Sequence, residues 1–224
     1  MEQLSPQVMH KLVFTILVHG LPDAQTGIAL DVLTEALGNP NSQVRELAVV
    51  ALAELPVSPA KRVAALSRAM KDSGSRVRRR AARALGDFAA HALPALPVLV
   101  AGLRDPDASV RRDSAGTLGR LGPAAHVAAP SLVSLLADPE TRTRVVVATA
   151  LKRIGRGVVP ALVQGLRHGD ADLRGRCATL LGKLPDDDET AADALRAAAD
   201  DRDADVRDRA EAALEALGAG LVTA

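Results

Sequence analysis

An arginine recurs along the chain at a nearly constant interval, and this periodicity limits the possible folds more than any other feature. Successive copies lie 33, 33, 33, 30 and 33 residues apart. Val, Thr or Leu comes directly before each copy, and Leu stands seven residues after it. The recurring arginines are Arg45, Arg78, Arg111, Arg144, Arg174 and Arg207. Six copies in one register indicate a repeat protein, in which each unit packs on its neighbours.

The residues around each arginine follow the period of an α-helix. Apolar residues recur one position before the arginine and three, four, seven and ten positions after it, which is the pattern of an amphipathic helix. A shorter apolar run precedes this segment, as in residues 96–103, and ends at an Asp-Pro or Gly-containing turn. Pro97, Pro130 and Pro160 occupy one column of this earlier run, where proline would start or bend a helix. Each unit is therefore predicted to be a helix–turn–helix, and the fold to be all-α.

Composition agrees with closely packed helices. The 224 residues include only two aromatic side chains, Phe14 and Phe88, so Ala, Leu and Val must fill the core. The longest apolar stretch falls far short of the roughly 20 residues that a membrane span needs, and the N-terminus lacks the features of a signal peptide. A single cysteine, Cys177, cannot form an internal disulfide. We expect a cytoplasmic protein without membrane contact.

The third unit, residues 105–122, carries a family resemblance. Its sequence, DPDASVRRDSAGTLGRLG, resembles HEAT repeats of the short bacterial type that is named after phycobilisome lyases. The likeness covers residues 25–218 and implies an α-solenoid, a superhelix of about six helix–turn–helix repeats whose second helices line the concave surface. The fourth unit departs from the pattern at Thr143 and Lys152, and the shortened fifth unit departs at His168-Gly169.

Both ends of the chain are expected to cap the solenoid. Apolar spacing in residues 1–20 predicts a capping helix, with Val8, Leu12, Val13, Ile16 and Leu17 on one side. In the last repeat, Glu211 and Glu215 replace residues that are mostly small or apolar in the earlier repeats. We therefore expect a single α-solenoid domain over residues 1–224, with six repeats in residues 25–218 and the last repeat acting as the C-terminal cap.

Charge is segregated along the chain. Residues 61–183 hold 22 bases and nine acids, whereas residues 1–60 hold two bases and six acids and residues 184–224 hold four bases and twelve acids. At about 100° per residue, eight bases share one side of the second helices, opposite the apolar columns. We call this set the basic face: Arg76, Arg80, Arg83, Arg120, Arg142, Arg153, Arg176 and Lys183. It is expected to form a positive trough across repeats two to five, interrupted by Asp87, Asp113 and Asp172.

The recurring arginines themselves are interpreted as a structural ladder. Asp stands six residues before four of them, with Asn39 and His168 in the other two repeats. An Asp at a helix start can accept hydrogen bonds from the backbone or from arginine in each repeat. This role explains the repetition without a ligand.

No motif for catalysis or metal binding is visible. Cys177 stands in an apolar column and is expected to be a buried, inert thiol. The five histidines lack the spacing of metal ligands, and the acidic run in residues 186–189 suits the start of a helix better than a calcium loop. Phosphate loops and nucleophile elbows are absent from the sequence. It therefore predicts a non-enzymatic protein without a cofactor.

The basic face favours a scaffold that holds an acidic protein or peptide segment. Binding of duplex nucleic acid through its backbone is the alternative, although the scarcity of aromatic residues argues against base stacking. A role as a bilin-lyase-like subunit is suggested only by the name of the repeat type. Head-to-tail self-association is a further hypothesis, in which the acidic last repeat of one molecule docks in the trough of another.

Overall fold

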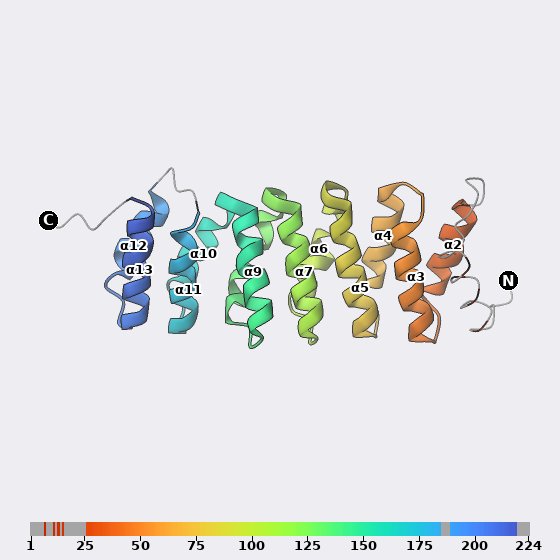
Figure 1. Ribbon diagram of the computed structural model, residues 1–224, viewed down its shortest axis with the longest axis horizontal. Helices are drawn as coiled ribbons and strands as arrows, with labels where there is room; N and C mark the ends of the chain where they lie inside the picture. The colour runs from red at the N-terminus through yellow and green to blue at the C-terminus, as the bar shows by residue number, and fades with distance from the viewer. Residues whose placement is uncertain are drawn as a thin grey trace. The chain divides into compact units, whose positions relative to one another are not determined.

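The computed structural model describes residues 7, 11, 13, 15, 26–184 and 189–218. The regular structure in these residues consists of α-helices and short 3-10 helices, with no strand (Figure 1). This confirms the predicted all-α fold. No helix within the described ranges is both long enough and apolar enough to cross a membrane.

The helices form consecutive pairs that correspond to the six predicted repeats. The pairs are α2 (Thr26–Ala36) with α3 (Ser42–Glu54), α4 (Pro59–Ala69) with α5 (Ser75–Leu85), α6 (Leu96–Gly102) with α7 (Ala108–Leu121), α8 (Ala129–Ser134) with α9 (Thr141–Ile154), α10 (Val159–Gly165) with α11 (Ala171–Leu181), and α12 (Thr190–Ala198) with α13 (Ala204–Ala216). Four 3-10 helices lie between them, η2 (Gly86–Ala95), η3 (Gly122–Ala128), η4 (Leu135–Ala137) and η5 (Gly155–Val158).

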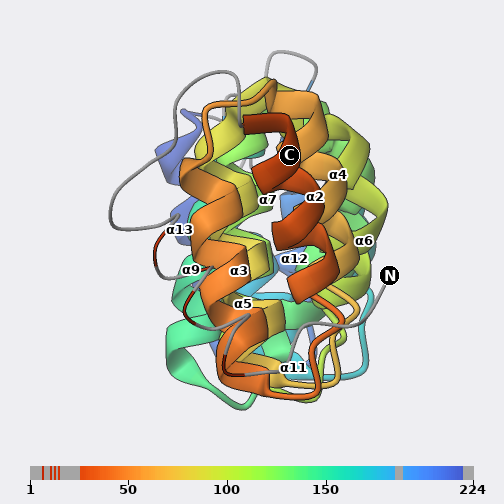
Figure 2. The same ribbon diagram turned by 90° about the vertical axis from the view of Figure 1, so that its right-hand side faces the viewer.

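The chain divides into two compact units, with the boundary inside α7 between Thr117 and Leu118. In the first unit α3 and α5 pack side by side, and α4 packs against both. Figure 2 shows this unit end-on, with α3 and α5 on one side and α2 and α4 on the other. In the second unit α11 and α13 pack side by side, and α12 packs against both. The single domain over residues 1–224 stays a prediction.

Local sequence sets where the helices begin. Asn41, Asp170 and Asp203 each accept a hydrogen bond from the backbone N–H two residues ahead and so cap α3, α11 and α13. Proline stands in the first turn of α6, α8 and α10, where its missing N–H leaves no helical hydrogen bond unmade. The proline column therefore starts the first helices and does not bend them.

The predicted core columns are buried. The residues before the recurring arginines are at most 3% exposed, and the leucines seven positions after them are at most 1% exposed. They are Val44, Val77, Val110, Thr143, Leu173 and Val206, and Leu52, Leu85, Leu118, Leu151, Leu181 and Leu214. One stripe of each second helix thus forms the interior of its unit.

The predicted N-terminal cap lies mostly outside the described residues, as do residues 186–188 of the acidic run. Gln7, Lys11, Val13 and Thr15 are helical, and Val13 is buried. At the other end, Glu211 and Glu215 of α13 are exposed, as a C-terminal cap requires. Both caps remain predictions.

Candidate functional site

The recurring arginines join neighbouring repeats. Arg78 donates through one Nη to the carbonyl oxygens of Asp72 and Ser73, at 2.8 and 3.0 Å. Its Nε and other Nη donate to the Asp105 carboxylate, at 2.7 and 2.8 Å. Arg45 holds Asp72 in the same way. Each of these arginines therefore donates to the backbone carbonyl of the residue six positions before it and to the carboxylate of the aspartate 27 positions after it.

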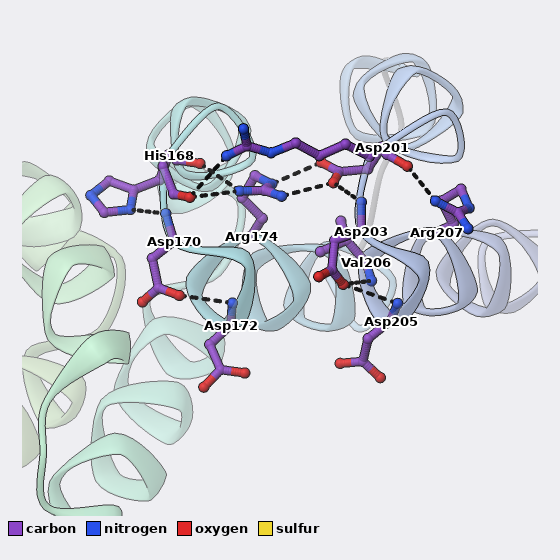
Figure 3. A network of polar contacts seen from close by, with 11 residues as sticks. His168, Asp170, Asp172, Arg174, Asp201, Asp203, Asp205, Val206 and Arg207 are labelled. Carbon is purple, nitrogen blue, oxygen red and sulfur yellow. Dashed lines mark hydrogen bonds and ion pairs between the residues drawn. The ribbon is translucent and has the colours of Figure 1, made fainter.

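Figure 3 shows the same arrangement between the fifth and sixth repeats. Arg174 donates to the carbonyl oxygens of His168 and Gly169, and it donates two hydrogen bonds of 2.8 Å to the Asp201 carboxylate. Asp201 also accepts from the Asp203 N–H, at 2.9 Å. The hydrogen bonds from Arg174 lower the pKa of Asp201 below its ordinary value, against the opposing effect of burial. These groups are charged and mutually satisfied, which supports the structural interpretation of the ladder.

The ladder is interrupted after the fourth repeat. Arg144 donates to the carbonyl oxygens of Asp138 and Pro139 and to the Thr141 hydroxyl. The position that supplies the carboxylate in other repeats is occupied by His168, whose ring accepts a hydrogen bond from the Asp170 N–H. Within the part of the chain that the structure describes, no carboxylate pairs with Arg144. The fourth and fifth repeats therefore lack the ion pair that joins their neighbours.

The basic face is largely at the surface of each unit. In the first unit, Arg76, Arg80 and Arg83 are exposed on α5, and Arg80 forms an ion pair of 3.1 Å with Glu46 of α3. In the second unit Arg176 is half-buried, and the exposed members are Arg120, Arg142, Arg153 and Lys183. The Arg80–Glu46 pair was not foreseen. The trough across repeats two to five involves both units and stays a prediction.

The second unit contains a groove of about 320 Å³ that is lined by residues of η4, α9, α11 and α13 and by Lys183, which follows α11. We call it the α9–α11 groove. Its bases are Arg144, Lys152, Arg176, Lys183 and Arg209. Its apolar side chains are Leu136, Val145, Ala148 and Leu180. The groove brings together Arg176 and Lys183 of the basic face, Arg144 of the ladder, and two bases that the sequence analysis assigns to no site, Lys152 and Arg209. Of the bases assigned to no site, Lys152 is detectable in the sequence, because it departs from the repeat pattern.

Hydrogen bonds to other protein groups hold three of these bases, Arg144 as described above and also Arg176 and Arg209. Arg176 donates to the Leu136 carbonyl oxygen and to Asp172, the latter at 3.3 Å. Arg209 donates to Asp205, at 2.9 Å. Lys152 and Lys183 are exposed and form no ion pair within the described residues. The lysines are therefore the bases best placed to meet an external anion.

Cys177, the single cysteine of the chain, lies in the core. Cys177 is fully buried, and burial raises the pKa of its thiol to about 12, so the thiol stays protonated near neutral pH. In the described ranges, no three His, Cys, Asp or Glu side chains are grouped so that they could hold a metal ion.

Comparison with known families agrees with this architecture. HEAT repeats match residues 30–119, 63–148 and 129–215. The protein belongs to the HEAT-repeat family. No curated protein sequence matches the chain.

Several solved structures are similar to this HEAT-repeat protein. An engineered protein is 23% identical with a TM-score of 0.55, over 85% of this chain and 97% of that one. The CpcE–CpcF complex of phycocyanin lyase from Nostoc sp. PCC7120 is 25% identical with a TM-score of 0.51, over 84% and 77%. Importin beta is 17% identical with a TM-score of 0.65, over 96% of this chain but only 32% of its own. The matches establish an α-solenoid fold.

Proposed function

We propose that this HEAT-repeat protein is a non-catalytic scaffold that holds an acidic segment of a protein partner on the exposed bases of its second helices. One observation carries the proposal. On α5, Arg76, Arg80 and Arg83 are exposed, whereas Val77 and Leu85 of the same helix are completely buried. Val77 and Leu85 belong to the core of the repeat, whereas the three arginines place positive charge on the opposite, exposed side of the helix.

Physical chemistry gives these bases a role in recognition. Exposed charges steer an oppositely charged partner and orient it, and their effect falls with ionic strength. Arg142 and Arg153 of α9 supply such charges in the second unit, and neither forms an ion pair within the described residues. HEAT repeats commonly serve in protein interaction, since solenoids present extended surfaces.

Two features favour a protein over a nucleic acid. Val145 is 61% exposed beside the bases of the α9–α11 groove, and an apolar side chain of a protein can cover it, whereas a phosphate backbone cannot. Phe88 is buried, so it presents no ring on which a base could stack. Duplex binding through the backbone alone is the second candidate, supported by the same arginines.

The test is the binding of a fluorescein-labelled polyglutamate peptide, measured by fluorescence anisotropy at low salt. The triple variant Arg76→Glu, Arg142→Glu and Arg153→Glu is expected to weaken binding about tenfold, since each exposed pair contributes up to about 1 kcal/mol. The matched control is Lys61→Glu, Arg68→Glu and Arg167→Glu, which makes the same charge change at exposed positions outside the second helices.

The control variant is expected to bind within about threefold of the wild type. Equal loss in both variants would mean that only net charge matters, and it would overturn the assignment to the second helices. Absence of binding by the wild-type protein would overturn the proposed function itself.

A further inference from the structure

The α9–α11 groove originates in two substitutions at positions where other second helices meet. Eight residues after the recurring arginine, Gly119 and Gly182 face the residues six after the next arginine, Ala150 and Ala213. A Cβ atom on these glycines would stand 2.7 Å from the Ala150 Cα and 2.6 Å from the Ala213 Cα. The helices can approach this closely because both partners are small.

Lys152 and Leu180 occupy the same two positions at the junction of the fourth and fifth repeats. Their bulk does not permit a Gly–Ala approach. Consistent with this, α9 and α11 do not pack against each other as α11 and α13 do, and the two repeats join through α8 with α10 and through η4 with α11. The second-helix side of this junction is therefore left open.

The shortened spacing acts at the same junction. The connection η3, which follows the third repeat, has 7 residues, whereas η5, which follows the fourth, has 4. This loss of three residues accounts for the spacing of 30 in place of 33. The interruption of the arginine ladder at Arg144 also falls here. Four departures from the repeat thus coincide at one junction: Lys152, Leu180, the short η5 and the interrupted ladder at Arg144.

The opening uncovers apolar surface in the middle of the chain. The residue four after the recurring arginine is at most 1% exposed in the first, second, third and fifth repeats. In the fourth repeat this residue is Ala148, which is only half-buried and lines the groove beside Val145. At the end of a solenoid, a second helix also lacks a neighbour on one side, and polar residues then cover that side. The open side of α9 instead keeps the apolar residues Val145 and Ala148.

Charge around this apolar surface indicates the occupant. Five bases surround it, and Arg176 and Arg209 are oriented by contacts within the protein. Among the described residues no acid lines the groove, although Arg176 pairs with Asp172 and Arg209 with Asp205 at its edge. A volume of about 320 Å³ accommodates a few apolar side chains of a segment that lies over the groove. An apolar anchor with carboxylates beside it fits this chemistry, and an amphipathic helix presents both on one face.

We propose that the α9–α11 groove receives an acidic amphipathic helix of a partner protein, with its apolar side chains on Val145 and Ala148 and its carboxylates beside Lys152 and Lys183. The proposal rests on the proposed function and names the site and the chemistry of the segment that is held. Apolar burial supplies the affinity, and the lysines select an acidic sequence.

The probe is a fluorescein-labelled helical peptide of about 15 residues, built from Glu, Ala and Leu with the leucines on one face. Two companions replace every Leu by Ala or every Glu by Gln. Fluorescence anisotropy is expected to show that the wild-type protein binds the Glu/Leu peptide at least about fivefold more tightly than either companion. Val145→Glu and Lys152→Glu are expected to weaken its binding about tenfold.

Arg167→Glu is the matched control, because it makes the same charge change as Lys152→Glu at an exposed residue outside the groove. It is expected to bind within about twofold of the wild type. Val145 and Lys152 are exposed, so both groove variants should fold, and circular dichroism melting checks that they do.

Equal affinity for the Glu/Leu and Glu/Ala peptides would overturn the inference, as would groove variants that bind like the wild type. If polyglutamate still responds to the Arg76, Arg142 and Arg153 changes in that case, the proposed function stands and only the groove assignment fails. If sedimentation shows a dimer that Lys152→Glu dissociates, a second copy occupies the groove and the inference is wrong.

Discussion

Gly182 lies so close to Ala213 that a Cβ atom on the glycine would stand 2.6 Å from the Ala213 Cα. Gly119 and Ala150 have the same relationship in the third and fourth repeats. Lys152 takes the glycine's place where the α9–α11 groove opens. Close packing of neighbouring second helices therefore depends on small residues in both of these columns.

Gly119→Ala and Gly182→Ala are each expected to destabilise the protein by about 1–3 kcal/mol, because the new methyl group meets backbone atoms that must move. Helix propensity alone predicts the opposite sign, since Ala favours a helix over Gly by about 1 kcal/mol. Urea denaturation measures the difference. Lys152→Ala is the control and is expected to change stability by less than about 0.5 kcal/mol. Stabilisation by the glycine replacements would contradict the close contact.

Thr143→Val is expected to stabilise the protein by about 1 kcal/mol. The Thr143 hydroxyl is buried without a hydrogen-bond partner, and the equivalent residue is Val in four other repeats. Replacement removes the cost of burying the hydroxyl at nearly constant volume. Thr117→Val is the matched comparison, because the Thr117 hydroxyl donates to the Ala82 carbonyl oxygen at 2.7 Å. Thermal melting should show the two substitutions shifting Tm in opposite directions.

Asp201→Asn is expected to destabilise the protein by about 2 kcal/mol at neutral pH, because it removes charged hydrogen bonds to Arg174. The folded pKa of Asp201 is lowered, so its stabilisation is present above the ordinary Asp value of about 3.9 and is lost as pH falls through the folded pKa. The difference from wild type in urea denaturation should therefore shrink in acid. A difference that does not depend on pH would contradict the account.

Cys177 is expected to resist a thiol-specific disulfide reagent at about pH 8 in the folded protein and to react fully in denaturant. The side chain is buried and burial raises its pKa to about 12, so neither access nor thiolate is available. The folded thiol stays protonated while an unfolded one ionises, so its contribution to stability declines as pH rises above about 8.5. Absorbance of the released thiolate follows the reaction. Rapid labelling of the native protein would show that the site opens.

Much of the fold follows from local periodicity. Amphipathic spacing that repeats six times in register predicts Val77 and Leu85 in the core, and both are completely buried. The proline column predicts a start or a bend of the first helices in the same way, and the structure shows starts. These features depend on neighbours in the sequence.

The ladder and the groove depend on residues that meet between repeats. The Arg78–Asp105 pair joins residues that lie 27 positions apart. The helical pattern predicts a structural role for Arg78, but it does not say toward which neighbouring repeat the guanidinium points. The groove requires Lys152, Leu180 and the short η5 connection to act together on α9 and α11. Each of these three features is visible in the sequence as a departure from the repeat. The groove that they open depends on how α9 and α11 lie relative to each other, which the repeat pattern does not give.

Direct competition tests the central claim that the exposed bases serve an acidic polypeptide. The labelled Glu/Leu peptide is bound to the wild-type protein at about 0.15 M salt, and unlabelled peptide or random-sequence duplex DNA is added at equal charge. We expect the peptide to displace the probe and the duplex to leave the anisotropy unchanged. Displacement by the duplex at equal or lower concentration, with a steep salt dependence, would contradict the account and assign the bases to phosphate contacts.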